Sequence, residues 1–310
     1  MIVRERPTAW RLFFILRGSI ILKTAPQIIG TMLFSTLVAY SHGQFFHKDL
    51  TFTAAPFTIL GLALSIFLGF RNSAAYDRYW EGRRLWGELV VSCRVLCRQA
   101  ATLIGPGQAS KDVDEIRSRM VRRAAALAHA LRHHLRGTAA NGDLRPFLSC
   151  DDLSAVLSSS NPPHAVIRML SHDLEQCLSL KLIDGSLAAA MDNTFASMER
   201  VVAGCERIRS TPIPFSYMLL LHRTAYLYCF LLPFGLVDTV GLATPFVVGL
   251  VSYTFFGLDA LGDEIEEPFG TQPNDLPLSA LSRIIEIGVR EALGEADLPR
   301  PLVPIDYALA

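Results

Sequence analysis

Four stretches of mainly apolar residues constrain what this chain can fold into. Residues 25–39 lie in a run free of Asp, Glu, Lys and Arg that extends toward Phe46, and residues 51–70 carry no charge. Residues 214–237 are apolar apart from His222 and Arg223, and residues 239–258 are again uncharged. A helix crosses the hydrocarbon core of a bilayer, about 30 Å thick, in about 20 residues. Because only short segments separate the members of each pair, we predict four transmembrane helices in two hairpins.

The segment between the two hairpins has helical rather than strand-like patterning. Apolar and aromatic residues recur at spacings of three and four from Tyr76 through Trp80 to Leu89, and Gly- and Pro-rich breakers separate further helical pieces. We therefore predict an all-α integral membrane protein whose second span continues into a large helical cytoplasmic region. The predicted parts are an N-terminal interfacial helix (1–24), the first transmembrane hairpin (25–70), the cytoplasmic helical region (71–211), the second transmembrane hairpin (212–258) and a C-terminal cytoplasmic segment (259–310).

The distribution of basic residues gives the orientation. Five of them precede the first span, and Arg71, Arg78, Arg83 and Arg84 follow the second. Since cytoplasmic loops are enriched in Lys and Arg, both termini and residues 71–211 are expected in the cytoplasm, with the spans in the cell inner (plasma) membrane. The 29 basic and 29 acidic residues balance, which argues against a nucleic-acid partner.

Two short motifs lie beside the predicted spans. Residues 70–87 read Phe-Arg-Asn-Ser-Ala-Ala-Tyr-Asp-Arg-Tyr-Trp-Glu-Gly-Arg-Arg-Leu-Trp-Gly, and residues 267–270 read Glu-Pro-Phe-Gly. Together with Ile213-Pro214 and the two-hairpin layout, they resemble the bestrophin family, in particular its bacterial members, over nearly the whole chain. The positions that match the family signature are Arg71, Asn72, Asp77, Arg78, Trp80, Pro268, Phe269 and Gly270.

The resemblance implies a homopentamer that assembles around a central pore. In the family, three apolar residues of the second span line a narrow neck, and the matching positions are Leu62, Ile66 and Phe70. Their spacing of four keeps them on one helix face, so five copies would form three stacked rings, which can gate by dewetting. The alternative is that this stripe packs one helix on another. The family also has a cytoplasmic aperture, which we place at Leu180.

Polar residues in or next to the second hairpin form two further candidate sites. His222 and Arg223 are costly at membrane depth; they are either a pore-facing or coupling site or structural partners of a carboxylate in another span. Glu264, Glu266, Glu267 and Asp275 follow the fourth span and are candidates for cation attraction or binding, the alternative being a solvated helix end.

The ion and the gating stimulus are predicted from the resemblance. Calcium-gated animal members carry a nearly continuous acidic run after Pro-Phe-Gly, whereas this chain has Thr271-Gln272-Pro273-Asn274-Asp275. Calcium takes six to eight oxygen ligands, so we expect calcium gating to be weak or absent, and we assign no metal site. Bacterial members are similar to cation channels, so the predicted permeant ions are monovalent cations, Na⁺ or K⁺, with chloride as the alternative.

Other function classes stay open on the sequence alone. A small-solute carrier would use Arg223 and His222 as its coupling site, and a non-conducting membrane scaffold would dock a partner on an exposed surface within residues 110–175. No nucleophile, base and orienting group can be combined from the motifs, so we expect neither an enzyme nor a cofactor. The expected partners are further copies of the chain, membrane lipid and permeant ions.

Overall fold

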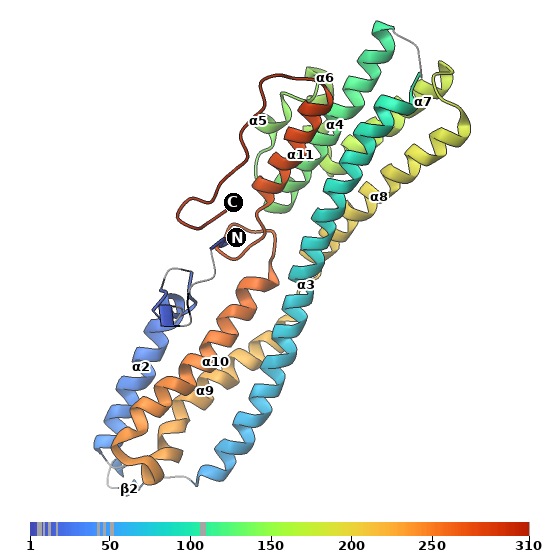
Figure 1. The fold of residues 1–310 in the computed structure, drawn as a ribbon. Coiled ribbons are helices and arrows are strands. Elements are labelled where there is room, and N and C mark those ends of the chain that lie inside the picture. The colour runs from blue at the N-terminus through green and yellow to red at the C-terminus, as the bar shows by residue number, and fades with distance from the viewer. Residues whose placement is uncertain are drawn as a thin grey trace. The chain divides into compact units, whose positions relative to one another are not determined.

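The computed structural model describes residues 1–4, 8, 10–11, 14–16, 18–41, 44–45, 48–49, 53–105 and 110–309 of the chain. Its helices and strands are α2 (Ile21–Tyr40), β1 (Gln44–Phe45), β2 (Lys48–Asp49), α3 (Ala54–Leu103), α4 (Lys111–Arg136), α5 (Asn141–Leu144), α6 (Cys150–Ser158), α7 (Pro162–Ser179), α8 (Gly185–Ser210), α9 (Phe215–Val240), the 3-10 turn η1 (Gly241–Ala243), α10 (Thr244–Glu266) and α11 (Leu278–Ala292). The fold is helical, as predicted, apart from the two-residue strands β1 and β2 (Figure 1).

The chain divides into two compact units. The first, which we call the polar unit, comprises Met1–Arg4, Trp80–Thr211 and Pro268–Ala310, and the second, the span unit, comprises Glu5–Tyr79 and Pro212–Glu267. The 50-residue helix α3 contributes to both, because the boundary falls between Tyr79 and Trp80. The predicted continuation of the second span into the following region is confirmed as one uninterrupted helix.

The span unit contains the apolar stretches. Among the described residues, three helical segments are long and apolar enough to cross a membrane: Ile21–Tyr40, Ala54–Leu103 and Phe215–Glu266. The third consists of two helices, α9 with 26 residues and α10 with 23, which η1 joins and which pack against each other. Gly241 ends α9 with a φ of 58°, a backbone conformation that glycine adopts without steric cost.

The first two spans, α2 and the first half of α3, follow each other along the chain as predicted for the first hairpin, and other helices lie between them in space. Helix α2 packs against α10 and α9, and Figure 1 shows these two helices between α2 and the first half of α3. Two contacts account for the choice: Thr31 donates a hydrogen bond to Ser252 over 3.1 Å, and the rings of Phe34 and Phe230 stack with centroids 4.4 Å apart.

The polar unit is built around α4, which packs against α7, α8 and α11. Its alanines and leucines are buried, and so are Arg123 and His129. Arg123 forms ion pairs with Asp173 at 2.5 Å and with Asp152 at 2.8 Å, and His129 lies 3.4 Å from Glu286. The expected exposed docking surface within residues 110–175 is therefore wrong for most of α4, because carboxylates distant in sequence compensate its charges.

The two ends of the chain meet within the polar unit. The backbone N–H of Val3 donates to the carbonyl of Tyr307 and that of Leu309 to the carbonyl of Met1, each over 2.8 Å. Of the predicted interfacial helix 1–24, residues 5–7, 9, 12, 13 and 17 lie outside the described residues. Residues 1–4, 8, 14–16 and 18–20 are described and are not helical, so the prediction of one helix over this stretch is wrong. The last four residues of this stretch belong to the apolar helix α2.

Candidate pore-lining stripe and buried charge network

The predicted neck residues form an exposed apolar stripe on α3. Leu62, Ile66 and Phe70 are 64%, 49% and 64% exposed in the single subunit. On the opposite side of the same helix, Leu64 and Leu68 are buried in a core shared with α9 and α10. The stripe is thus not used for packing within one subunit, and it stays available to further copies of the chain or to lipid.

The residue that follows the stripe is a fully buried arginine. The side chain of Arg71 has no exposed surface, and three carboxylates of α10 surround its guanidinium. Nη1 donates to Asp259 over 2.6 Å, Nη2 donates to Asp263, and Nη2 lies 3.9 Å from Glu266. The spacing of four and then three residues along α10 puts the three carboxylates on one face of that helix.

His222 joins this network from α9. Its Nδ1 lies 2.7 Å from the second carboxylate oxygen of Asp259, so Asp259 bridges Arg71 and His222. Of the two roles considered for His222, the structural partner of a carboxylate is the one that the geometry supports. Arg223 is exposed on the surface of the subunit. His222 is the eighth residue of α9, so it lies nearer to an end of the helix than the predicted span suggested.

The expected acidic cluster is not a solvated helix end. The helix α10 continues to Glu266, eight residues beyond the predicted end of the fourth span, and both Glu264 and Glu266 are buried. Glu266 accepts a hydrogen bond from the backbone N–H of Ile213 over 2.9 Å, while Glu267 is exposed. In the polar unit, Asp275 is buried and accepts from the N–H of Gln272 over 2.6 Å.

These carboxylates do not form a metal site in one subunit. Among the described residues, no group of three or more His, Cys, Asp or Glu side chains could hold a metal ion. Cation attraction by Glu264, Glu266, Glu267 and Asp275 at a pore mouth therefore stays a prediction.

The remaining signature residues of the span unit lie close to the network. Asn72 follows Arg71, and a Cβ added at Gly262 would lie 2.5 Å from its side-chain oxygen, so only glycine fits there without a shift. Arg78 donates from Nε to the backbone carbonyl of Glu266 over 3.2 Å. Asp77 is exposed.

In the polar unit the two sequence motifs contact each other. A Cβ added at Gly82 would lie 3.0 Å from the ring of Phe269, which is buried. The carbonyl of Phe269 accepts from Arg136 over 3.3 Å, and that of Pro268 accepts from the N–H of Leu276 over 2.9 Å. The two motifs are therefore coupled by packing. Trp80 is 44% exposed, and Gly270 is half-buried.

The predicted aperture residue lies at the end of α7. Leu180 is the residue after Ser179, and its side chain is 54% exposed. Lys181 follows with a φ of 56°, so the chain turns sharply here before α8 begins at Gly185. The role of Leu180 as the cytoplasmic aperture stays a prediction.

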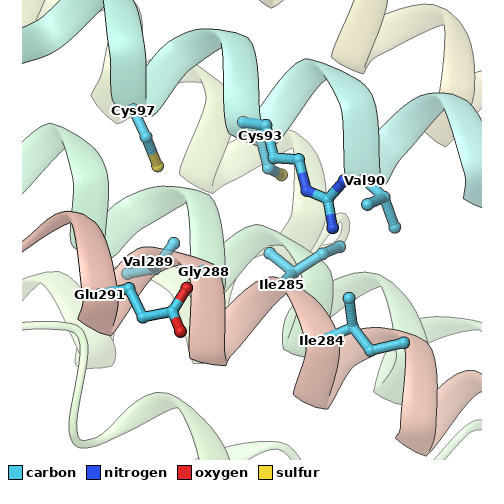
Figure 2. Close-up of a pocket in the computed structure, with 9 residues that line it drawn as sticks. Val90, Cys93, Cys97, Ile284, Ile285, Gly288, Val289 and Glu291 are labelled. Carbon is cyan, nitrogen blue, oxygen red and sulfur yellow. The ribbon is translucent and has the colours of Figure 1, made fainter. Parts of the chain in front are cut away.

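A small cavity of about 230 Å³ lies in the polar unit between α3 and α11. Figure 2 shows Cys93 and Cys97 of α3 on one side of it and Ile285 and Val289 of α11 on the other. Burial raises the pKa of the Cys97 thiol to about 11. A thiol with so high a pKa is a weak nucleophile, so this cavity offers no sign of covalent chemistry.

Sequence reasoning missed Asp259 and Asp263, which hold Arg71. Ending the fourth span at residue 258 left Asp259 and Asp263 outside the predicted helix and without a predicted partner. A signal in the sequence could have found them. Arg71 directly follows the second span, and Asp259, Asp263 and Glu266 follow the predicted fourth span at spacings of four and three residues.

Comparison with known proteins places this geometry in a family. The family model described as "Bacterial/Fungal Bestrophin protein" matches residues 1–291. A protein of Mesorhizobium japonicum named voltage-dependent anion channel-forming protein mll4386 is 44% identical over 99% of this chain and 96% of its own length. The Escherichia coli K12 protein named voltage-dependent anion channel-forming protein YneE is 40% identical over 98% of both chains. A crystal structure of a bacterial bestrophin homologue from Klebsiella pneumoniae is similar with a TM-score of 0.83 and 37% identity, covering 88% of this chain and 99% of that one.

Proposed function

Because the chain belongs to the bacterial and fungal bestrophin family, we propose that it is one subunit of a homopentameric ion channel in the cell inner membrane. The observation that carries the proposal is the exposed stripe of Leu62, Ile66 and Phe70 opposite a buried helix face. Four transmembrane helices per subunit, namely α2, the first half of α3, α9 and α10, would form a filled bundle. A conducting path therefore requires several copies of the chain, with the stripe facing the common axis.

In this arrangement the apolar side chains of the neck control whether water and ions can pass. Five copies of the stripe would give three apolar rings, which exclude water and ions when they are narrow. Leu180 is proposed as a second constriction at the cytoplasmic end of the pore. The pairing of Val3 with Tyr307 within the polar unit supports placing both chain ends on the same side of the membrane as residues 80–211.

The experiment is ion flux into liposomes that contain the purified protein, comparing wild type with Leu62→Ala, Ile66→Ala and Phe70→Ala. Each truncation removes apolar bulk from a ring, so faster flux is expected. Leu33→Ala is the matched control, because Leu33 is 66% exposed but belongs to α2 and not to the helix that carries the stripe. Unchanged flux in all three stripe variants would contradict the assignment of these residues to the neck. A folded, oligomeric protein without any flux would favour the scaffold, and flux that saturates with solute concentration would favour a carrier.

Anion selectivity and cation selectivity are each supported by a different observation. The names of the curated relatives point to anions. Asp77 favours the monovalent cations: it is exposed and lies seven residues, about two helical turns, beyond Phe70 on the same face of α3. Arg84 lies a further seven residues along, so Asp77 is the charge nearest to the neck on that face. We propose cation selectivity on this basis.

The reversal potential under a KCl gradient decides between them. A value near the potassium limit that moves toward zero in Asp77→Asn would support cation selectivity, because apolar rings carry no sign of their own. A value near the chloride limit in the wild type would assign anion selectivity and leave the neck in place.

We further propose that calcium does not gate this channel. Asp275 is the one carboxylate in residues 271–275, and calcium needs six to eight oxygen ligands. Micromolar calcium is expected to leave flux unchanged. An increase with calcium that a chelator reverses would contradict this.

A further inference from the structure

The buried charge network connects the neck to a titratable group. Phe70, the last neck residue, is followed directly by Arg71, whose guanidinium is completely buried. Asp259 accepts from Arg71 with one oxygen over 2.6 Å and lies 2.7 Å from His222 Nδ1 with the other. Two contacts thus lead from the imidazole to the residue beside the neck, and each lies within the distance of a charge-assisted hydrogen bond.

The network carries more negative than positive charge. One guanidinium faces Asp259, Asp263 and Glu266, which leaves a surplus of two negative charges while His222 is neutral. A proton on His222 reduces that surplus to one. Its side chain is 46% exposed on the single subunit, whereas that of Asp259 is 5% exposed.

The groups that face His222 come from three helices. Asp259 and, beyond it, Asp263 belong to α10, and Arg71 belongs to α3. On α9 itself the ring of Tyr226 lies 4.4 Å from the imidazole, centroid to centroid. Among these groups the imidazole is the one whose charge ordinarily changes between about pH 5 and pH 8.

We infer that His222 is a positioning residue of the neck, acting through Asp259 and Arg71, and that its protonation makes ion flux depend on pH. The inference rests on the proposed function, because it needs the stripe to be the neck. Protonation strengthens the contact between His222 and Asp259 and so favours the conformation in which Arg71 is held. That conformation fixes the backbone at Phe70 and keeps the apolar rings narrow, so acidification lowers flux.

The size of the effect follows from the hydrogen bond. A charge-assisted bond is about twice as strong as a neutral one, which corresponds to roughly a fivefold shift of the equilibrium between held and released states. Wild-type flux is therefore expected to be about fivefold lower near pH 5.5 than near pH 8.

The test is the pH profile of liposome flux for wild type and His222→Gln. Glutamine can still donate to Asp259 but does not titrate, so its profile is expected to be flat. His172→Gln is the matched control, because His172 is 79% exposed, lies in the polar unit and pairs with Glu175 of its own helix. It should leave the wild-type profile unchanged.

A second variant guards against misfolding of the first. Asp263→Asn removes one negative charge near His222 at a side chain that is 46% exposed. Because this change alters the charge of the network that contains His222, the midpoint of the flux profile is expected to differ from that of the wild type.

The outcomes separate the inference from the proposed function. A flat profile in His222→Gln together with the shifted midpoint in Asp263→Asn supports the inference. If Leu62→Ala has faster flux, three results would overturn the inference and leave the proposed function in place. They are an unchanged pH profile in His222→Gln, a flat pH profile in the wild type, and wild-type flux that rises with acidification. Absence of flux in every protein, Leu62→Ala included, overturns the proposed function and the coupling to the neck with it.

Discussion

Two carboxylates of the same network offer a matched test of what holds α3 to α10. Asp259 is 5% exposed in its side chain and makes two contacts, to Arg71 and to His222. Asp263 is 46% exposed and contacts Arg71 alone. Replacing each with asparagine keeps the shape and removes one negative charge, so the two variants differ in burial and in the number of contacts. We expect Asp259→Asn to destabilise the protein and Asp263→Asn to have little effect.

The magnitude follows from the contacts. A hydrogen bond to a charged group contributes about 1.5–3 kcal/mol and a neutral one about 0.5–1.5 kcal/mol, so converting both bonds of Asp259 costs about 2 kcal/mol. Relief of repulsion among the three carboxylates offsets part of this, and Glu266 stays near Arg71 in both variants. An exposed ion pair is worth about 0–1 kcal/mol. For a chain of this size the difference between the variants corresponds to a shift of about 4 °C in melting temperature.

The assay is thermal loss of the assembled protein in one detergent, followed by size-exclusion chromatography after heating. Wild type, Asp259→Asn and Asp263→Asn are compared at the same pH, because His222 contacts Asp259. Equal melting temperatures for the two variants would refute the reasoning, since burial and contact number would then not decide the cost. A larger loss in Asp263→Asn would show that its contact to Arg71 dominates instead.

Three further predictions concern packing, capping and acid stability. In Gly235→Ala the added Cβ would lie 2.4 Å from the ring of Phe57, so we expect a loss of about 1–3 kcal/mol in thermal denaturation, whereas Gly30→Ala, with nothing within 4 Å, should show no such loss. Asn161→Ala removes the side-chain acceptor at the start of α7 and should cost about 1 kcal/mol in the same assay. Burial acts to raise the pKa of Glu286, but the imidazole of His129 at 3.4 Å and the nearby arginines outweigh this and hold the pKa below its ordinary value. The stability that this carboxylate adds is present above that ordinary value and is lost as the pH falls through the lower folded one, so Glu286→Gln should flatten the acid side of a stability–pH curve.

The features that sequence could predict are local ones. The apolar runs and the continuation of the second span into α3 follow from composition and helical period over neighbouring residues. The family resemblance selects Leu62, Ile66 and Phe70, their spacing of four puts them on one helix face, and the structure shows that face exposed. Each of these requires only residues within a few turns of one another.

The features that sequence missed depend on partners far along the chain. Which helices cover α2 is decided by contacts such as Thr31 with Ser252, 221 residues apart. The burial of Arg123 in α4 depends on Asp173 and Asp152, which lie on other helices. A charged side chain in the sequence therefore does not by itself predict an exposed helix face. A carboxylate from another helix can compensate the charge and so allow the side chain to be buried.

The position of Arg71 explains how one helix can serve both a subunit and a pore. A buried arginine is costly, and here α10 compensates it with carboxylates and α9 adds His222. The subunit thus directs these polar side chains of α3 and α10 toward each other. What α3 leaves exposed beside them is the apolar stripe that ends at Phe70. A surface of this kind associates through its apolar area and carries no charge to bind an ion. In the proposed channel, control of permeation at the neck comes from water exclusion, and the sign of the ion is selected elsewhere, with Asp77 as the nearest candidate on that face.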